Sequence, residues 1–580
     1  MDIFSDIRAL VVDKLAVMVK EGLVPIGCNL QSVTVEPPRD PAHGDVATNA
    51  ALVLKGAERK PREIATDLAK RLIEDSRVAT AEVAGPGFLN LRLELDYWQQ
   101  SIRQIIENGE EFGRSDIGGG RRVNIEFVSA NPTGPLHVGH TRGAVFGDAL
   151  ANLLAFAGYQ VTREYYINDG GAQVDTLARS VYLRYLEALG REVVFGDDAY
   201  PGDYLVEIGK ELAAEKGEVW LDRPEEEWLA ALREYSTKAM MALIRDDLAS
   251  LGVNMDVYFS EKSLYDSGRI EASVQDLVGK DLIYEGQLTP PKGKVPDDWE
   301  PRVQTLFRST SHGDDVDRPL KKSDGNWTYF APDIAYHFDK ISRGYDILID
   351  VFGADHSGYV KRMKAAVSAL SDRKVTFDIK LIQLVRLLKK GEPFKMSKRS
   401  GSFVTLRDLI ERVGKDVTRF VMLTRKNDAT LDFDFDKVLE QSRDNPVFYV
   451  QYAHARIMSV LRRARRQGLS VDDEALVDID LAPLRHEADL AVMKKLAEWP
   501  RVIKIAAHNN EPHKIAFFLF ELAGEFHRLW NRGHDDPQLR IIQESNVTES
   551  LARITLARAV SIEIASGLSI LGVTPMQEMR

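Results

Sequence analysis

Hydrophobic residues change their spacing along the chain, and the changes mark where different kinds of element begin. In the middle, short apolar runs alternate with helical spacing: Val123–Val128 predicts a strand, residues 140–157 a helix, and Gln160–Ile167 a second strand. Strand patterns return at Tyr345–Phe352 and Val375–Leu384 after a long helical interval. Strands that alternate with helices form parallel sheets with right-handed crossovers. We therefore predict an α/β fold: an open, Rossmann-type parallel sheet that carries an insertion.

The segment before this sheet predicts a small α+β unit that ends at a glycine linker, residues 118–120. Its helical patterns lie at Ile3–Glu21, 47–54 and 62–73, and its strand patterns lie near Ser32–Glu36 and at Phe88–Leu93.

The segment after Lys398 is almost purely helical in its spacing, which predicts an all-α bundle at the C-terminal end. The helical stretches are 440–466, 485–508, 512–531 and 548–571. A chain of 580 residues is too long for one core, so several domains are expected. The predicted domains are 1–115, 116–400 with a helical insertion at about 175–260, a connecting helical region 401–445, and 446–580.

Composition and charge narrow the class of protein. With 44% hydrophobic and 28% charged residues the chain resembles a folded globular protein. The formal net charge of −12 argues against a protein that coats nucleic acid through one broad positive field. Local RNA binding stays open because five arginines crowd one helical stretch, although the charges alone favour a solvated helix face. These are Arg456, Arg462, Arg463, Arg465 and Arg466.

Location follows from similar observations. No apolar run is long enough for a membrane span, and the first residues, MDIFSDIRALVVDK, carry acids where a signal peptide would be basic. Cys28 is the single cysteine, which excludes an intrachain disulfide and a cysteine-rich zinc site. We expect a cytoplasmic protein without membrane contact or a protein-bound structural metal.

The segment after the first predicted strand contains His137, Gly139 and His140 at the start of a helix. Residues three apart in a first helical turn face the same side, and glycine lets a ligand approach the backbone. Exposed N–H groups at a helix start favour phosphate, and imidazole donors can follow charge onto phosphate oxygens. Taken alone, this short pattern is equally consistent with a purely structural turn.

A second short motif is Lys395-Met396-Ser397-Lys398, in a loop that carries Gly391, Pro393 and Gly401. Two ammonium groups three residues apart can both reach a leaving pyrophosphate. Met396 is an adaptable anchor for a loop that opens and closes. The alternative is an ordinary basic surface loop. The two motifs together are more informative than either motif alone, because one follows the first strand of the predicted parallel sheet and the other follows its last strand. Ligands collect where the carboxyl ends of such strands converge.

Together these motifs resemble the HIGH and KMSKS signatures of class I aminoacyl-tRNA synthetases, with Arg399 in place of the last serine. Further blocks are similar to the arginyl-tRNA synthetase family over essentially the whole chain: SANPTGPLHVGH (129–140), YINDGGAQV (166–174), SDGNWTYFAPDIAYHFDK (323–340), GADHSGY (353–359) and NPVFYVQYAHARI (445–457). The HIGH region comprises Ala130, Asn131, Pro132, Thr133, Gly134, Pro135, Leu136, His137, Val138, Gly139 and His140.

The resemblance implies roles for particular residues. The catalytic residues would be His137, His140, Lys395 and Lys398. ATP would also contact Thr133, Gly134, Pro135, Gly139, Gly353, Asp355, His356, Met396 and Ser397.

Arginine recognition requires carboxylates in a partly desolvated pocket with an aromatic face nearby. By resemblance, Tyr329 and Asp333 line this pocket, and Ser129 and Asn131 hold the α-amino group. Glu261 and Asp355 add negative charge. Two alternatives remain: Asp333 as an N-cap or first-turn acid after Pro332, and Asp355 with His356 as a buried structural pair.

The substrates implied are L-arginine, ATP with Mg²⁺ carried on its phosphates, and an arginine-accepting tRNA, used by a monomer. The N-terminal unit would bind the tRNA elbow through Phe88 and Asn90, although Phe88 could equally be core. The C-terminal bundle would bind the anticodon through Tyr449, Tyr452, Arg456 and Trp530, although aromatic residues at helical spacing are often core. A nucleotidyltransferase without an RNA substrate and a catalytically idle RNA-binding relative are the competing interpretations.

Overall fold

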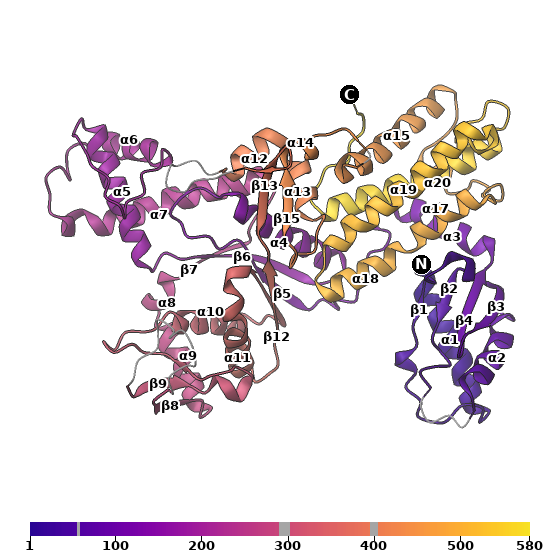
Figure 1. Ribbon diagram of the computed structural model, residues 1–580, viewed down its shortest axis with the longest axis horizontal. Coiled ribbons are helices and arrows are strands. Elements are labelled where there is room, and N and C mark those ends of the chain that lie inside the picture. Colours follow the sequence, from indigo (N-terminus) through magenta and orange to yellow (C-terminus); the bar gives the residue numbers. More distant parts are fainter. Residues whose placement is uncertain (55–58, 289–301, 395–403, 443, 580) are drawn as a thin grey trace. The chain divides into compact units, whose positions relative to one another are not determined.

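The computed structural model describes residues 1–54, 59–288, 302–394, 404–442 and 444–579 (Figure 1). The chain forms two compact units. One comprises Asp116–Glu440 with Leu571–Val573, and the other comprises Met1–Ser115, Gln441–Ile570 and Thr574–Arg580. The lysine motif 395–398 and Arg399 lie outside the described residues.

A five-stranded, all-parallel sheet organises the first unit. Its order is β12-β11-β5-β6-β7, so β5, the first of these five strands along the chain, lies at the centre. The direction of winding reverses between β5 and β11, and ligands bind at such a switch point beyond the carboxyl ends of the strands. The predicted open parallel sheet is confirmed. The strands are β5 (Arg122–Glu126), β6 (Gln160–Ile167), β7 (Val257–Ser260), β11 (Ile347–Gly353) and β12 (Thr376–Ile382).

The central strand β5 is covered on both faces, because alternate side chains of a strand point to opposite sides. Phe127, just after β5, lies against Gly147 of helix α4 (Val138–Phe156), where any larger side chain would overlap the Phe127 ring. Glu126 points the other way and contacts Lys340 of helix α10 (Phe330–Ser342). The predicted helix at 140–157 is confirmed as α4.

Between β6 and β7 the chain forms a helical insertion with its own apolar core. It comprises α5 (Ala172–Ala188), α6 (Tyr204–Lys216) and α7 (Glu225–Ser250), which Figure 1 shows grouped together. The predicted helical interval is confirmed.

A second excursion between β7 and β11 was not predicted, because its strands are too short to show a pattern. It contains α8 (Lys262–Asp266), α9 (Arg269–Gly279) and a small antiparallel sheet of β8 (Ile283–Gly286), β9 (Gln304–Phe307) and β10 (Arg318–Pro319). Helix α11 (Val360–Leu370) then joins β11 to β12.

After β12 the chain forms β13 (Val385–Lys389) and β14 (Glu392–Pro393), a hairpin that ends just before the lysine motif. Strand β15 (Leu431–Asp434) pairs in parallel with β13, so the segment after Lys398 is less purely helical than predicted. The motif therefore follows a separate small sheet, and the prediction that it follows the last parallel strand was wrong. The remaining helices are α12 (Leu406–Val413), α13 (Lys415–Met422) and α14 (Phe435–Val438).

The N-terminal part of the second unit is a four-stranded sheet with helices, which confirms the predicted α+β unit. The helix predicted at 47–54 is wrong, because Val46–Thr48 pairs with β4 as strand β2 and a turn follows. Its elements are α1 (Ile3–Lys20), β1 (Val35–Glu36), β2 (Val46–Thr48), α2 (Pro61–Leu72), β3 (Val78–Ala84), β4 (Phe88–Leu93) and α3 (Leu95–Asn108).

The C-terminal helices form the predicted bundle. The helix predicted at 485–508 is two helices, because Pro500 lies in the first turn of a new helix that starts at Trp499. The helices are α15 (Pro446–Arg466), α16 (Asp473–Leu476), α17 (Glu487–Ala497), α18 (Trp499–Asn509), α19 (His513–Asp535) and α20 (Val547–Ile570). Short 3₁₀ helices span Leu30–Ser32, Pro41–His43, Gly109–Glu111, Ser309–His312, Ala354–Tyr359 and Pro537–Leu539. Across the described ranges, none of the helices has the length and hydropathy of a membrane span.

Candidate active site and RNA-binding surfaces

The chain leaves β5 through a strained turn. Val128 and Ser129 have φ values of 70° and 41°, a region that costs a β-branched residue energy and persists only where the surroundings enforce it. The Ser129 hydroxyl donates to Glu126 Oε1 at 3.0 Å and accepts the Tyr166 N–H at 3.1 Å. These bonds fix the exit from the strand, and they direct the loop that follows across the carboxyl edge of the sheet.

The two predicted histidines lie together at the start of α4. His137 is the N-cap, and its Nδ1 accepts the Gly139 N–H at 3.0 Å. His140 Nδ1 accepts the His137 N–H at 3.4 Å, and the two rings stack with centroids 3.8 Å apart. A neutral imidazole that accepts at Nδ1 carries its proton on Nε2, so this hydrogen-bond pattern assigns both rings as Nε2–H donors. These Nδ1 bonds give the histidines a structural task in the turn, which was the alternative interpretation of the motif. The same bonds leave the proton of each ring on Nε2.

The loop that precedes these histidines is held by all three helices of the insertion. Asn131 Nδ2 donates to Gln173 Oε1 of α5 at 2.8 Å, and the Tyr204 hydroxyl of α6 donates to the Thr133 carbonyl at 2.8 Å. The Leu136 N–H donates to Asp247 Oδ2 of α7 at 3.2 Å. Pro135 and Gly134 lie within this loop, and a side chain at Gly134 would come within 3.2 Å of the Tyr204 hydroxyl.

Sequence patterns did not identify the three insertion residues that contact the loop: Gln173, Tyr204 and Asp247. Each is an ordinary helical polar residue when viewed alone.

The residues that directly follow the lysine loop lie against the histidine turn. The Val138 N–H donates to the Val404 carbonyl at 3.2 Å, and the Leu406 N–H donates to the Leu136 carbonyl at 2.8 Å. His137 and Thr405 form a β-bridge between these bonds. One flank of the lysine loop is therefore joined to the segment that carries the histidines. Lys395, Met396, Ser397 and Lys398 themselves lie outside the described residues.

Gly353, Asp355 and His356 follow β11 at the other side of the switch point. The Asp355 carboxylate is 3.6 Å from His356 Nε2, and the two side chains are 82% and 59% exposed. The interpretation of this pair as a buried structural contact is therefore wrong. Both residues face solvent at the edge where the loop after β5 begins.

The predicted arginine pocket contains two carboxylates that repel each other. Burial raises the pKa of Asp333 to about 6, although the Tyr359 hydroxyl donates to it at 2.5 Å. Burial, together with the negative charges of Asp333 and Asp169, raises the pKa of Glu261 to about 7. A guanidinium placed between the carboxylates would offset both effects.

Asp333 lies in the first turn of α10, but the helix has Tyr329 as its N-cap, so the N-cap interpretation of Asp333 is wrong. Tyr329 itself is 83% exposed, and the Lys322 ammonium lies 5.0 Å from its ring centroid. The Tyr329 ring is therefore a surface group and not part of the core.

The raised pKa of Glu261 predicts how arginine binding depends on pH. A bound cation favours the ionised carboxylate, so the Kd for arginine should fall about tenfold as the pH rises from 6 to 8 through the pKa of about 7. Calorimetric titration at several pH values checks this. Glu261→Gln should remove most of the dependence and leave the smaller change near pH 6 that comes from Asp333. A Kd that is constant between pH 6 and 8 in the unaltered protein contradicts the assignment.

On the N-terminal sheet, Phe88 and Asn90 lie on the solvent-facing side of β4. Phe88 is 43% exposed, Asn90 is half-buried and Arg92 is exposed, while the alternate residues Leu89 and Leu91 are buried. The interpretation of Phe88 as core is therefore wrong. An aromatic ring, an amide and a guanidinium on one face can stack with a base and bond to its edge.

Three of the four predicted bundle residues line one cavity of about 1040 Å³: Tyr452, Arg456 and Trp530. The Arg456 guanidinium lies between two rings, 4.2 Å from the Tyr452 centroid and 4.7 Å from that of Trp530. None of the three is buried, so these residues are not ordinary core. Tyr449 does not line the cavity and packs against Phe520 and His527.

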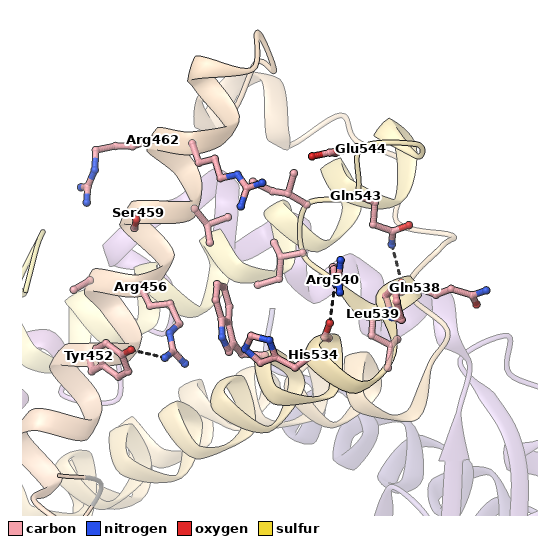
Figure 2. A pocket seen from close by; sticks show the side chains of 18 of the residues that line it. Tyr452, Arg456, Ser459, Arg462, His534, Gln538, Leu539, Arg540, Gln543 and Glu544 are labelled. Atoms are coloured by element: carbon pink, nitrogen blue, oxygen red, sulfur yellow. Dashed lines mark hydrogen bonds between the residues drawn. The ribbon is translucent and has the colours of Figure 1, made fainter.

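The opposite wall of this cavity was not identified from the sequence. Figure 2 shows α15 with Tyr452 and Arg456 on one side and His534 and Arg540 on the other. The Arg540 Nε donates to the Gly533 carbonyl at 3.1 Å. Arg462 and Arg463 add further positive charge to the rim, which suits a cavity for an unpaired base beside its phosphates.

The parallel sheet with its switch point, the stacked histidines and the loop that joins them define a class of protein. Residues 101–459 match the family described as "tRNA synthetases class I (R), catalytic domain". Residues 6–93 match "Arginyl tRNA synthetase N terminal domain", and residues 450–579 match "DALR anticodon binding domain". The fold and the site are those of a class I aminoacyl-tRNA synthetase.

Individual relatives narrow this class. A curated protein of Ruegeria pomeroyi named "Arginine--tRNA ligase" is 67% identical over 581 residues, which covers 100% of both chains. The solved structure of a putative arginyl-tRNA synthetase from Campylobacter jejuni is 33% identical, with a TM-score of 0.72, and covers 83% of this chain and 99% of that one. The Thermus thermophilus arginyl-tRNA synthetase shares the fold at 21% identity, with a TM-score of 0.73, over 99% and 100% of the two chains. The chain belongs to the arginyl-tRNA synthetase family.

Proposed function

We propose that this protein joins L-arginine to its tRNA at the expense of ATP. The arginine carboxylate attacks the α-phosphorus of ATP, which forms arginyl-adenylate and releases pyrophosphate. The 2′-hydroxyl of the terminal adenosine of the tRNA then attacks the adenylate carbonyl and releases AMP. The observation that carries this function is the pair of half-buried carboxylates, Asp333 and Glu261, whose charges repel each other in a class I catalytic unit.

The nucleotide would lie over the carboxyl edge of the sheet. His137 and His140 would donate from Nε2 to phosphate oxygens, while Lys395 and Lys398 neutralise the departing pyrophosphate. The first N–H groups of α4 are hydrogen-bonded within the turn or to Val404, so the imidazole Nε2–H groups would make the phosphate contacts. Gly139 is required beside them, because a side chain there would overlap the His137 ring. Further contacts to ATP would come from Thr133, Gly134, Pro135, Gly353, Asp355, His356, Met396 and Ser397.

Arginine would place its guanidinium between Asp333 and Glu261, with the Tyr329 ring beside it. Its α-ammonium would face Ser129 and Asn131, which lie at the exit of β5, and Asp355 would add negative charge. Two observations support one continuous pocket: the Tyr166 N–H donates a hydrogen bond to the Ser129 hydroxyl, and the charges of Glu261 and Asp333 raise the pKa of Tyr166.

Mg²⁺ would arrive with the ATP phosphates. In the described portions of the chain no group of three acidic, histidine or cysteine side chains could hold a metal, which supports this route. We also propose that the protein is a monomer, as the resemblance to the family implies, and that it lies in the cytoplasm, which its need for tRNA and ATP supports. Phe88 and Asn90 would bind the tRNA elbow, and the cavity of Tyr452, Arg456 and Trp530 an anticodon base. Tyr449 remains a proposed contact on weaker grounds, because it lies outside that cavity.

Pyrophosphate exchange with each amino acid, with and without total tRNA, tests this function. We expect exchange with arginine alone, and only when tRNA is present. Exchange without any RNA would contradict the tRNA requirement and favour a simple nucleotidyltransferase. A complete absence of exchange with tRNA and arginine would favour an idle RNA-binding relative.

Lys398→Ala should slow adenylate formation about 10²-fold while the Kd for arginine changes little, because its ammonium acts on pyrophosphate. Single-turnover formation of adenylate and equilibrium titration of arginine measure the two quantities. Lys389→Ala, in the hairpin strand that precedes the loop, is the matched control and should leave both unchanged. Equal rates for Lys398→Ala and the unaltered protein would remove the proposed role.

A further inference from the structure

Four charged side chains are buried beneath the proposed arginine pocket: Glu126, His337, Lys340 and Asp350. The Lys340 ammonium, which is fully buried, donates to Glu126 Oε2 at 2.6 Å and to Asp350 Oδ1 at 3.0 Å. His337 contacts Asp350 Oδ2 at 2.9 Å and the Asp333 carbonyl at 2.8 Å. Burial opposes ionisation of Asp350, but Lys340 and His337 lower its pKa. Both carboxylates of the cluster are therefore paired with the Lys340 ammonium, and a buried charge requires such a partner.

The other oxygen of Glu126 reaches the surface of the pocket through Ser129. The Ser129 hydroxyl has one proton and two lone pairs. Its proton is directed to Glu126 Oε1 at 3.0 Å, and one lone pair accepts the Tyr166 N–H at 3.1 Å. One acceptor site on the oxygen is left for a further partner. An α-ammonium group has only hydrogen-bond donors, so it requires a neighbour that accepts, and a Ser129 hydroxyl held in this way does so.

We infer that Glu126, which is paired with the Lys340 ammonium, is a positioning residue that fixes the Ser129 hydroxyl as a hydrogen-bond acceptor for the α-ammonium of arginine. This inference rests on the proposed function, since it assumes that Ser129 faces that group. Burial raises the pKa of Glu126, and the ammonium of Lys340 opposes this effect. A neutral amide at position 126 could donate to Ser129 and turn the hydroxyl proton toward the ammonium, where it repels.

Glu126→Gln tests this, with binding to the full-length protein measured by calorimetry for L-arginine and for deamino-arginine, which lacks the α-amino group. The Kd for arginine should rise about 10- to 100-fold, as expected when a charged hydrogen bond is lost. The Kd for deamino-arginine should stay within about threefold, because its guanidinium and carboxylate contacts remain. Glu126→Asp keeps the charge beside Lys340 but draws the oxygen back from Ser129, and it should show the same selective loss.

The chain offers a matched control in Glu164, which pairs with Glu126 in the sheet register and is equally buried. Glu164 contacts Arg343, Tyr336 and Asn124, and none of its hydrogen bonds involves Ser129. Glu164→Gln should therefore leave the ratio of the two Kd values unchanged.

Ser129→Ala should reproduce the selective loss, and adding Glu126→Gln to it should change the ratio no further. Glu126 variants that weaken both ligands equally, or neither, overturn the positioning role while the proposed function stands. A Ser129→Ala variant that leaves the ratio unchanged overturns the inference together with the assignment of Ser129 to the α-amino group. The proposed arginine charging has a separate test, which is the pyrophosphate exchange assay on the unaltered protein.

Discussion

Replacing His137 with Asn is expected to slow arginyl-adenylate formation about 10²- to 10³-fold while leaving the fold intact. His137 has two tasks in this account: its Nδ1 caps α4 in the structure, and its Nε2–H is the proposed donor to phosphate. Asparagine is among the best N-cap residues, so it preserves the first task and removes the second. Single-turnover adenylate formation in the presence of tRNA measures the rate, and thermal unfolding reports on the cap.

His137→Ala supplies the comparison, because it removes both tasks. It should show the same slow chemistry together with about 1 kcal/mol lower stability from the lost cap. If His137→Asn were as fast as the unaltered protein, the imidazole would have only a structural purpose, and its stacking on His140 would be a packing feature.

Asp333→Asn is expected to weaken arginine binding about 10²- to 10³-fold, because a desolvated carboxylate that faces a guanidinium loses its charge. The Tyr359 hydroxyl already donates to this carboxylate, so the asparagine can keep that bond and the local structure. Binding of L-arginine and of uncharged L-citrulline, measured at pH 8 where both pocket carboxylates are ionised, gives the relevant ratio.

The matched control for this substitution is Asp339→Asn on the same helix. The Asp339 carboxylate pairs with Arg343 at 2.9 Å and with Arg269 at 3.3 Å. It should affect stability and leave the preference for arginine over citrulline unchanged. A preference that survives Asp333→Asn would place the guanidinium elsewhere.

The parallel sheet was predictable from the sequence because its strands are long enough to show a period. Residues 160–167 were predicted as the strand that β6 forms, and the apolar run at 345–352 overlaps β11. The small sheets were not predictable, because β10 and β14 are two residues long and β15 is four. At Val46–Thr48 the spacing favoured a helix, and pairing with a distant strand determined the outcome.

The site was predictable only where a residue's chemistry is visible in a short motif. His137, Asp333 and Ser129 stand in such motifs. Asp247 and Lys340 are more than a hundred residues from their partners in the loop and in β5, so no local pattern connects them. Likewise, the exposure of Phe88 and of Asp355 depends on the completed fold, and only the structure separated the surface and core interpretations.

The most direct test is a crystal structure of the protein with tRNA, arginine and a non-hydrolysable ATP analogue. The account predicts that Nε2 of His137 and His140 and the ammonium groups of Lys395 and Lys398 lie within about 3.5 Å of oxygens of one triphosphate. It also predicts the arginine guanidinium between Asp333 and Glu261. A triphosphate bound away from the histidine turn, or lysines directed to another ligand, would contradict it.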